Sequence, residues 1–175
     1  QGLRDSERWL AASAEAWVAQ GLDERLIPAM TSLVGDLIQR SEDIAELLWQ
    51  LLPEADFERA EHRFPHGRIP ADLAEQAAGL VAQWDQLYRE ATRLEAALEN
   101  SQTAGSSSAD SAIAGAADPD LNLANAQGLV ARAEQQLAVW RAFADAPGEG
   151  EPGDGWARWC QHLSLIPHLT LPTMM

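Results

Sequence analysis

The chain has 175 residues, with 27 acidic side chains against 12 basic ones, all of them arginine, and a formal net charge of −15. This charge opposes nonspecific binding to a phosphate backbone, which needs clustered cations. The longest apolar runs are too short to cross a bilayer and no signal sequence opens the chain, so we expect a cytoplasmic protein without a membrane partner. Hydrophobic residues, mostly alanine and leucine, make up 46% of the chain and predict an all-α fold with a buried core.

The single cysteine and the first residues of the chain further limit the class of protein. The single cysteine, Cys160, excludes an internal disulfide, and alone it cannot hold an iron–sulfur cluster or a structural zinc ion. Its expected role is that of a small buried hydrophobe. The chain begins at Gln1 without a methionine and enters a helical pattern almost directly, so we interpret it as an excised piece of a larger protein.

An amphipathic first helix is expected from about Asp5 to Gln20. Gly21 follows it as the kind of residue that commonly ends a helix in the left-handed conformation. The residues expected to share the buried face of this helix are Trp9, Ala12, Ala16 and Trp17.

A second helical region follows, because apolar residues recur at helical spacings up to Pro53. Ser41 begins a short polar run of the kind that caps a new helix. The pattern is therefore consistent with one helix or with two. The apolar positions of this region are Leu26, Met30, Leu33, Leu37, Ile44, Leu48 and Leu51.

The clearest pattern predicts a long antiparallel helical hairpin. Pro70 suits a first helical turn, and apolar residues then follow a 4-3 rhythm over 73–98. A similar stripe over 121–144 supplies the partner helix. The segment 100–120, rich in Ser, Ala, Gly and Asp, is expected to be a flexible crossing. The two stripes consist of Leu73, Ala77, Leu80, Trp84, Leu87, Ala91, Leu94 and Leu98, and of Ala126, Leu129, Ala133, Leu137, Trp140 and Ala144.

The C-terminal part has a different composition. Residues 146–155, rich in Pro and Gly, are expected to form a second flexible linker. Within 156–175, leucines at a period of two indicate short extended pieces, and Trp156 and Trp159 are candidates for packing onto a neighbouring domain. We therefore divide the chain into a helical domain at 1–145, the linker, and either the start of a following domain or an irregular tail.

One segment breaks the helical pattern. Glu61–Pro70 reads EHRFPHGRIP, and from His62 to Arg68 it holds two arginines, two histidines and no acid. We expect a short extended link around residues 61–69, with Phe64 as its anchor in the core.

The sequence contains no recognisable catalytic machinery. His62 and His66 have the spacing of two metal ligands on a helix, but Pro65 and Gly67 argue against a helix there. No phosphate-binding loop, dinucleotide fingerprint, nucleophile elbow or zinc-protease motif occurs. We therefore predict no catalytic, metal-binding or cofactor-binding residue in this chain.

The run from Ala60 to Leu73, followed by a leucine-rich helix, a second amphipathic helix and a tryptophan-bearing segment, resembles DinG-type DNA helicases, bacterial relatives of the XPD helicases. In that family an EHRF-x-x-G-x-[LI]-P element lies inside a helical, arch-like insertion that follows the DEAH box of the first motor domain. Leu51–Pro53 falls at a comparable place, and the resemblance covers roughly residues 5–160. After Trp159 the family continues into the strands of the second motor domain, and the tail of this chain departs from that pattern.

The resemblance implies a parent protein that hydrolyses ATP with magnesium, moves 5′ to 3′ on single-stranded DNA and carries a 4Fe–4S cluster. The family places its ATP-binding motifs and cluster cysteines outside the arch, so neither cofactor is expected in this chain. The expected function is that of an arch-like domain that helps to enclose and guide single-stranded DNA. Its expected partners are that strand and the other domains of the same protein, and a monomer is expected.

The resemblance also suggests which residues contact DNA. Arg63 and Arg68, helped by His62, are the candidate nucleic-acid-binding residues, and they would face phosphates at the rim of the pore. The alternative is that Arg63 and His62 hydrogen-bond to backbone carbonyls and carboxylates, and so fix a sharp link.

A different function class remains open beside the helicase. The hairpin of 73–98 and 121–144 would also suit a free-standing all-helical adaptor that binds another protein. A 4-3 seam by itself does not distinguish an intramolecular hairpin from a dimer.

Overall fold

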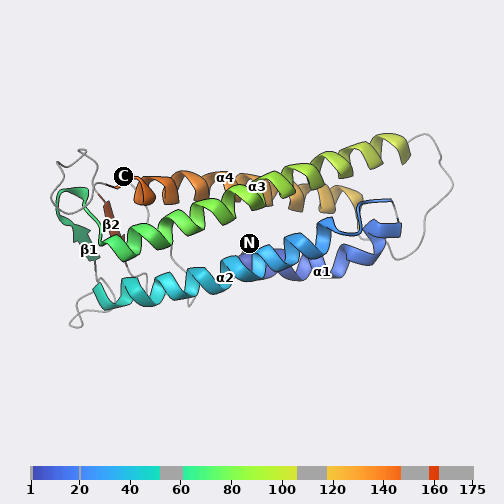
Figure 1. Cartoon of the computed structure of the whole chain (residues 1–175). Coiled ribbons are helices and arrows are strands. Elements are labelled where there is room, and N and C mark those ends of the chain that lie inside the picture. The colour runs from blue at the N-terminus through green and yellow to red at the C-terminus, as the bar shows by residue number, and fades with distance from the viewer. Residues whose placement is uncertain (1, 20, 52–60, 106–117, 147–157, 162–175) are drawn as a thin grey trace. The chain divides into compact units, whose positions relative to one another are not determined.

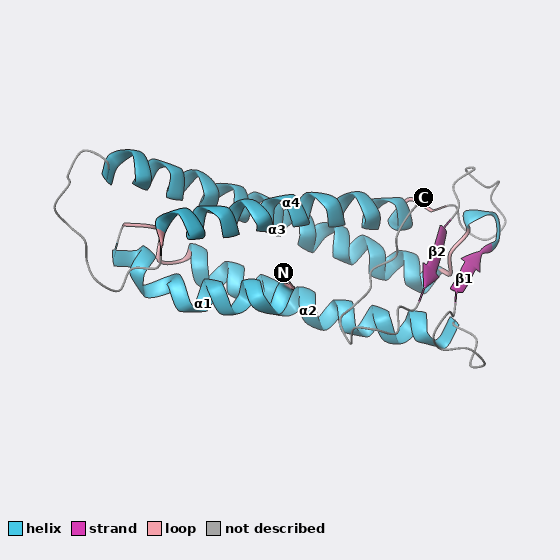
Figure 2. Cartoon of the chain, turned by 180° about the vertical axis from the view of Figure 1, so that it is seen from behind, coloured by secondary structure: helices cyan, strands magenta, loops and turns pink. Residues whose placement is uncertain are grey.

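The computed structural model describes residues 2–19, 21–51, 61–105, 118–146 and 158–161 (Figure 1). It confirms the all-α fold, to which one short two-stranded ribbon is added, as the colouring by element type shows (Figure 2). The helices are α1 (Leu3–Ala19), α2 (Leu26–Leu51), α3 (Ala71–Gly105) and α4 (Pro119–Ala144). The remaining described elements are strand β1 (Glu61–Phe64), a turn at Pro65–Gly67 and strand β2 (Arg158–Gln161). Within these ranges, none of the helices combines the length and apolar character that crossing a membrane requires.

The chain divides into two compact units. Unit 1 consists of Gln1–Asp36 and Trp84–Glu134, and unit 2 of Leu37–Gln83 and Gln135–Met175. In unit 1 the end of α3 lies beside the start of α4, and in unit 2 the start of α3 lies beside the end of α4 (Figures 1 and 2). Helices α3 and α4 therefore run antiparallel within each unit, as the predicted hairpin requires.

The end of α1 is a Schellman motif, and it confirms the predicted role of Gly21. This glycine has φ +89°, and its N–H donates to the carbonyl of Val18 at 3.0 Å. The N–H of Leu22 donates to the carbonyl of Trp17, also at 3.0 Å. Leu22 and Trp17 are both buried, which is the hydrophobic contact that usually accompanies this cap. The motif turns the chain from α1 toward α2.

The buried face of α1 differs in part from the prediction. Trp17 is buried as expected, but Ala12 is exposed, and Leu10 and Ser13 take the inner positions. Trp9 is half-buried, and its indole Nε1 donates to Oδ1 of Asn122 on α4 at 3.0 Å. The burial of Leu10 and Trp17 thus sets the rotation of this helix, because alanines offer too little apolar area to compete.

Helix α2 is one continuous helix. Ser41 is 3% exposed inside it and does not cap a second helix. The apolar stripe passes through this point, with Leu37 and Ile44 both buried, so packing on one side of the helix outweighs the local capping signal.

The seam predicted for the hairpin is confirmed. Every one of its eight positions on α3 is at most 5% exposed, and five of the six on α4 are likewise buried. Ala144 is half-buried, and Phe143 takes its place in the core at 1% exposure. Asn122 continues the α4 stripe toward its start as a buried polar residue that is hydrogen-bonded to Trp9.

Helix α3 extends beyond the predicted stripe of 73–98, and α4 begins before the predicted start at 121. Residues up to Gly105 are helical, although we expected a flexible crossing from 100. Gln102 explains part of this, because its Nε2 donates to the carbonyl of Pro119 at 3.0 Å within unit 1. Pro119 itself suits the first position of a helix, and Asp118 precedes it with Oδ1 accepting the N–H of Asp120 at 3.0 Å. The rest of the expected crossing, and most of the linker at 146–155, lie outside the described residues.

A glycine on α3 leaves room for an arginine of α2 in unit 2. The guanidinium of Arg40 lies against Gly79, where a Cβ atom would collide with its Nη1. The missing side chain thus makes room for a half-buried arginine beside the backbone of α3.

Candidate functional site

The three residues singled out for DNA contact lie in and just after β1, in unit 2. His62 and Arg63 occupy the second and third positions of the strand, and Arg68 follows the turn at Pro65–Gly67. Arg68 is half-buried, and its backbone N–H donates to the carbonyl of Pro65 at 3.1 Å. The segment is extended and then turned, as expected, so His62 and His66 are not on one helix face.

The sharpness of this link comes from two left-handed residues in succession. His66 has φ 56° and ψ 22°, and Gly67 has φ 72°. Together with the hydrogen bond from Arg68 to Pro65, these angles match a type I′ turn. A histidine in this conformation is strained, whereas glycine adopts it without cost, so Gly67 is the residue that permits the turn.

Gly67→Ala is expected to lower the free energy of unfolding by about 1–2 kcal/mol, because alanine disfavours a positive φ and Gly67 is also buried. Urea denaturation followed by circular dichroism measures this change. His66→Gly is the matched control at the neighbouring exposed position, where it relieves strain and is expected to leave stability unchanged or raised. Equal losses in both variants would contradict this account of the turn.

Aromatic contacts in the core hold the extended link at 61–69 in place. Phe64 is 5% exposed, which confirms its predicted role as an anchor, and its ring meets that of Phe143 on α4 edge-on at 6.1 Å between centroids. Phe143 in turn lies 6.0 Å from the ring of Trp140. The aromatic contacts therefore tie the end of β1 to α4 within unit 2.

Strand β2 is the partner that the sequence did not reveal. The two strands pair antiparallel, with His62 opposite Cys160, Arg63 opposite Trp159, and Phe64 opposite Arg158. The strands are far apart in the chain, and no turn signal joins them, so local pattern could not predict the pairing.

A second feature, in unit 1, was also missed by the sequence analysis. A solvent-open groove of about 550 Å³ lies between the turn that joins α1 to α2 and the last turns of α3. We call it the Arg25–Arg93 groove after its two cationic residues. Its other lining residues are Gly21, Leu22, Asp23, Leu26, Ala29, Glu90, Ala97, Asn100 and Ser101.

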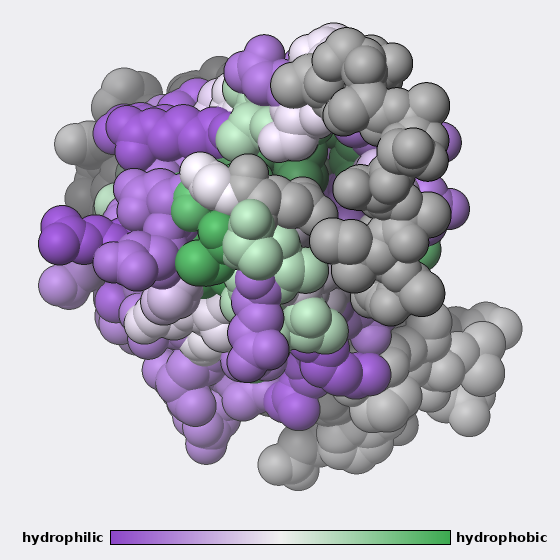
Figure 3. All heavy atoms as spheres, turned by 90° about the vertical axis from the view of Figure 1, so that its right-hand side faces the viewer, coloured by the Kyte–Doolittle hydropathy of each residue, from purple (hydrophilic) through white to green (hydrophobic). Residues whose placement is uncertain are grey.

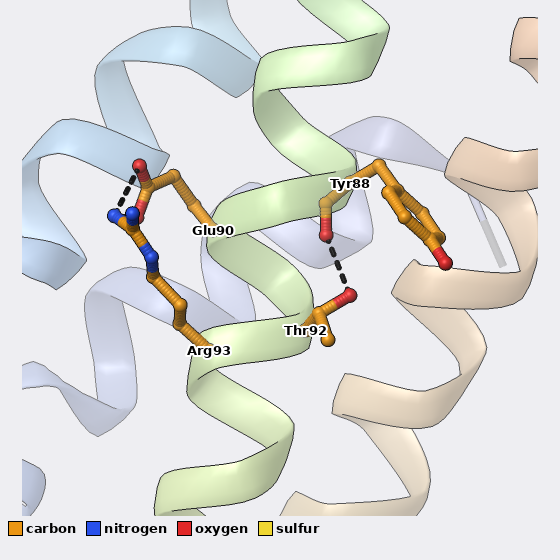
Figure 4. Close-up of polar contacts among 4 residues, drawn as sticks. All are labelled: Tyr88, Glu90, Thr92 and Arg93. Atoms are coloured by element: carbon orange, nitrogen blue, oxygen red, sulfur yellow. Dashed lines mark hydrogen bonds and ion pairs between the residues drawn. The ribbon is translucent and has the colours of Figure 1, made fainter.

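Local hydrogen bonds shape both sides of this groove. The Schellman motif at Gly21 bends one side, and Oδ1 of Asp23 then accepts the backbone N–H of Arg25 at 2.9 Å. On α3, Nη1 of Arg93 donates to both carboxylate oxygens of Glu90, at 3.0 and 3.1 Å. Figure 4 shows this pair on the opposite side of α3 from Tyr88, whose carbonyl accepts a hydrogen bond from a threonine.

Apolar and charged side chains adjoin each other at this end of unit 1. Figure 3 views the molecule from the side on which α3 ends and α2 begins, and green apolar atoms there are bordered by purple hydrophilic ones. Leu22 is buried at 9% exposure, whereas Arg25 is exposed. The lining of the groove is therefore mixed, with apolar and charged side chains next to each other.

No metal site is evident in the part of the chain that the structure describes. Within it, no three His, Cys, Asp or Glu residues come together in a group that could hold an ion. Comparison with known proteins adds no further assignment, because no family model, no curated protein and no solved structure matches the chain.

Proposed function

We propose that this chain is the arch-like helical domain of a DinG-type, ATP-dependent 5′–3′ DNA helicase, in which it helps to enclose and guide single-stranded DNA. ATP hydrolysis and the 4Fe–4S cluster belong to parts of the parent protein outside these residues. The chain therefore acts as a mechanical element and has no chemistry of its own.

The observation that supports this proposal most is the position of Glu61–Pro70. The segment has the spacing of the family's EHRF-x-x-G-x-[LI]-P element, and it leads directly into α3, the first arm of an antiparallel hairpin. The family element likewise lies within a helical insertion. A strand and turn with this sequence, followed directly by a long helix, support the proposal.

Electrostatics favour the same segment as the place of DNA contact. With a net charge of −15, most of the helical surface repels phosphates. The link concentrates Arg63, Arg68 and His62 without an acid between them. A positively charged path along the backbone is how proteins commonly bind single-stranded nucleic acid.

The test is the double variant Arg63→Ala/Arg68→Ala in the full-length helicase. We expect weaker binding to a labelled oligo(dT), with the salt slope of the binding constant reduced by about 1.4, because each lost phosphate contact contributes about 0.7 for single strands. Fluorescence anisotropy at several salt concentrations measures both quantities. Unchanged affinity and slope together with a lower melting temperature would mean that the arginines only fix the link.

Arg8→Ala/Arg89→Ala is the matched control for this experiment. It also removes two positive charges, from side chains that are 78% and 68% exposed on α1 and α3. It should leave the salt slope unchanged if the effect is local to the link.

The genomic reading frame separates this proposal from the adaptor alternative. A Walker A motif, four cysteines and a DEAH-like box upstream of Gln1 would support the helicase. A start codon directly before Gln1 would support a free-standing adaptor.

A further inference from the structure

Helix α4 carries a second stripe of residues, on the side opposite its buried seam. Its positions recur at alternating spacings of three and four residues, and each of them is exposed. None is charged, and Leu121 is 56% exposed. A stripe with this period suits packing against another helix. We call it the outer face of α4, and it consists of Leu121, Ala124, Gly128, Ala131, Gln135 and Ala138.

Gly128 lies in the middle of this face, and contacts among the described residues do not account for it. Glycine destabilises the interior of a helix, so it usually has a packing reason there. Gly79 has such a reason, because a Cβ atom at that position would collide with Arg40. At Gly128 the same atom would meet no atom of the described residues within 4 Å. The missing side chain instead suits the close approach of a second backbone from outside.

The residues along one edge of the outer face indicate what the second helix is. They are exposed, they are spaced seven residues apart, and they are Asp120, Gln127, Glu134 and Arg141. In an antiparallel pair of helices, such an edge faces the same edge of a second copy. With Gly128 packed against Ala131 of the partner subunit, Asp120 faces Arg141 of the partner subunit. Gln127 then faces Glu134 of the partner subunit, so the edge is complementary to itself.

Charge selects this register over its neighbours. A shift of seven residues in one direction places Asp120 opposite Glu134 of the partner subunit. A shift in the other direction places Glu134 opposite Glu134 of the partner subunit. Like charges that face each other across an interface are destabilising, whereas the register above has none along this edge. In addition, two copies that each carry −15 repel least where they meet along an uncharged face.

We propose that the outer face of α4 is the interface of a reversible dimer, in which the α4 helices of two copies pack antiparallel with Gly128 against Ala131 of the partner subunit. The same face is used by both copies, as in most soluble homodimers. Because α4 is one continuous helix, its own geometry fixes the spacing of these residues. A dimer replaces the monomer expected from the sequence. The outer face contains no residue of the link at 61–69, so the dimer is independent of the proposed DNA contact.

Sedimentation equilibrium of the 175-residue chain, at protein concentrations from about 10 μM to about 1 mM, tests the dimer. We expect the weight-average mass to rise with concentration from 19.0 kDa toward twice that value. A mass that stays at 19.0 kDa throughout would overturn the proposal. So would a mass that rises past that of a dimer, because two copies close an interface of this symmetry.

Gly128→Gln tests the face itself. Glutamine is a better helix former than glycine, so the melting temperature of the dilute chain is expected to rise. Its side chain also holds the two backbones apart, and the dissociation constant of the dimer is expected to increase at least about tenfold. Ala96→Gln is the matched control at an exposed position of α3, and it should leave the constant within about twofold. Equal weakening by both variants, or by neither, would overturn the assignment of the face.

Asp120→Arg tests the antiparallel register. It sets two positive charges against each other at both ends of the interface, so we expect a dimer roughly fivefold weaker. Asp36→Arg makes the same change of net charge on an exposed position of α2, and no weakening is expected there. The double variant Asp120→Arg/Arg141→Asp reverses the order of charges and should restore the constant to within about twofold. These two residues lie far apart in a parallel pair, so a failure to restore it would overturn the register.

Discussion

Replacing Trp84 by alanine is expected to lower the free energy of unfolding by about 3–5 kcal/mol, the range for large aromatic residues removed from a packed core. Trp84 is 1% exposed on α3 and belongs to the 4-3 seam that packs against α4. Its removal leaves a cavity that the surrounding helices fill only in part. Urea denaturation followed by circular dichroism measures the change, which is large compared with the stability of a typical domain.

Trp84→Phe is the control for this substitution. The phenyl ring keeps most of the packing, and the change deletes the indole Nε1, a buried donor without an acceptor among the described residues. We expect Trp84→Phe to cost well under half as much as Trp84→Ala. A loss below about 1 kcal/mol for Trp84→Ala would contradict the packing of the seam.

Replacing Phe64 by alanine is expected to cost about 3 kcal/mol or more and to release the strand pairing. The ring of Phe64 is buried against Phe143, and it is the described side chain of β1 that anchors the link in the core. A two-stranded ribbon is only marginally stable without such packing. Urea denaturation measures the global loss, and faster hydrogen exchange of the amides in β1 and β2 measures the local one.

A double-mutant cycle tests the aromatic contact itself. Phe64→Ala and Phe143→Ala, alone and combined, should yield a coupling energy of about 0.5–1.5 kcal/mol for the edge-on pair. Additive losses would show that the two rings stabilise the chain independently. Phe64→Leu should retain part of the stability and keep the exchange of the ribbon amides slow.

The seam of α3 was predictable because its signal is long and local. Eight apolar residues at alternating spacings of four and three all lie on one face of a helix. Packing then buries that whole face. The cap at Gly21 was predictable for a similar reason, since a glycine directly after an amphipathic stretch suits the left-handed conformation.

The details of α1 were not predictable in the same way. Two positions of its expected stripe, Ala12 and Ala16, are alanines whose burial contributes little, so Leu10 and Trp17 set the buried face. Trp9 is only half-buried, and it donates to Asn122, which lies on a helix far along the chain. In the same way, the bond from Gln102 to Pro119 favours helix in a segment whose composition indicated a flexible loop.

By itself the sequence determined the all-α class, the hairpin, the extended link at 61–69 and the burial of Phe64. Each of these follows from interactions within a few residues or from a periodic stripe. Only the tertiary structure decided that β1 pairs with β2, and that the Arg25–Arg93 groove forms between the α1–α2 turn and α3. Both join segments that are distant in the chain, and no local pattern records which distant residues will meet when the helices pack.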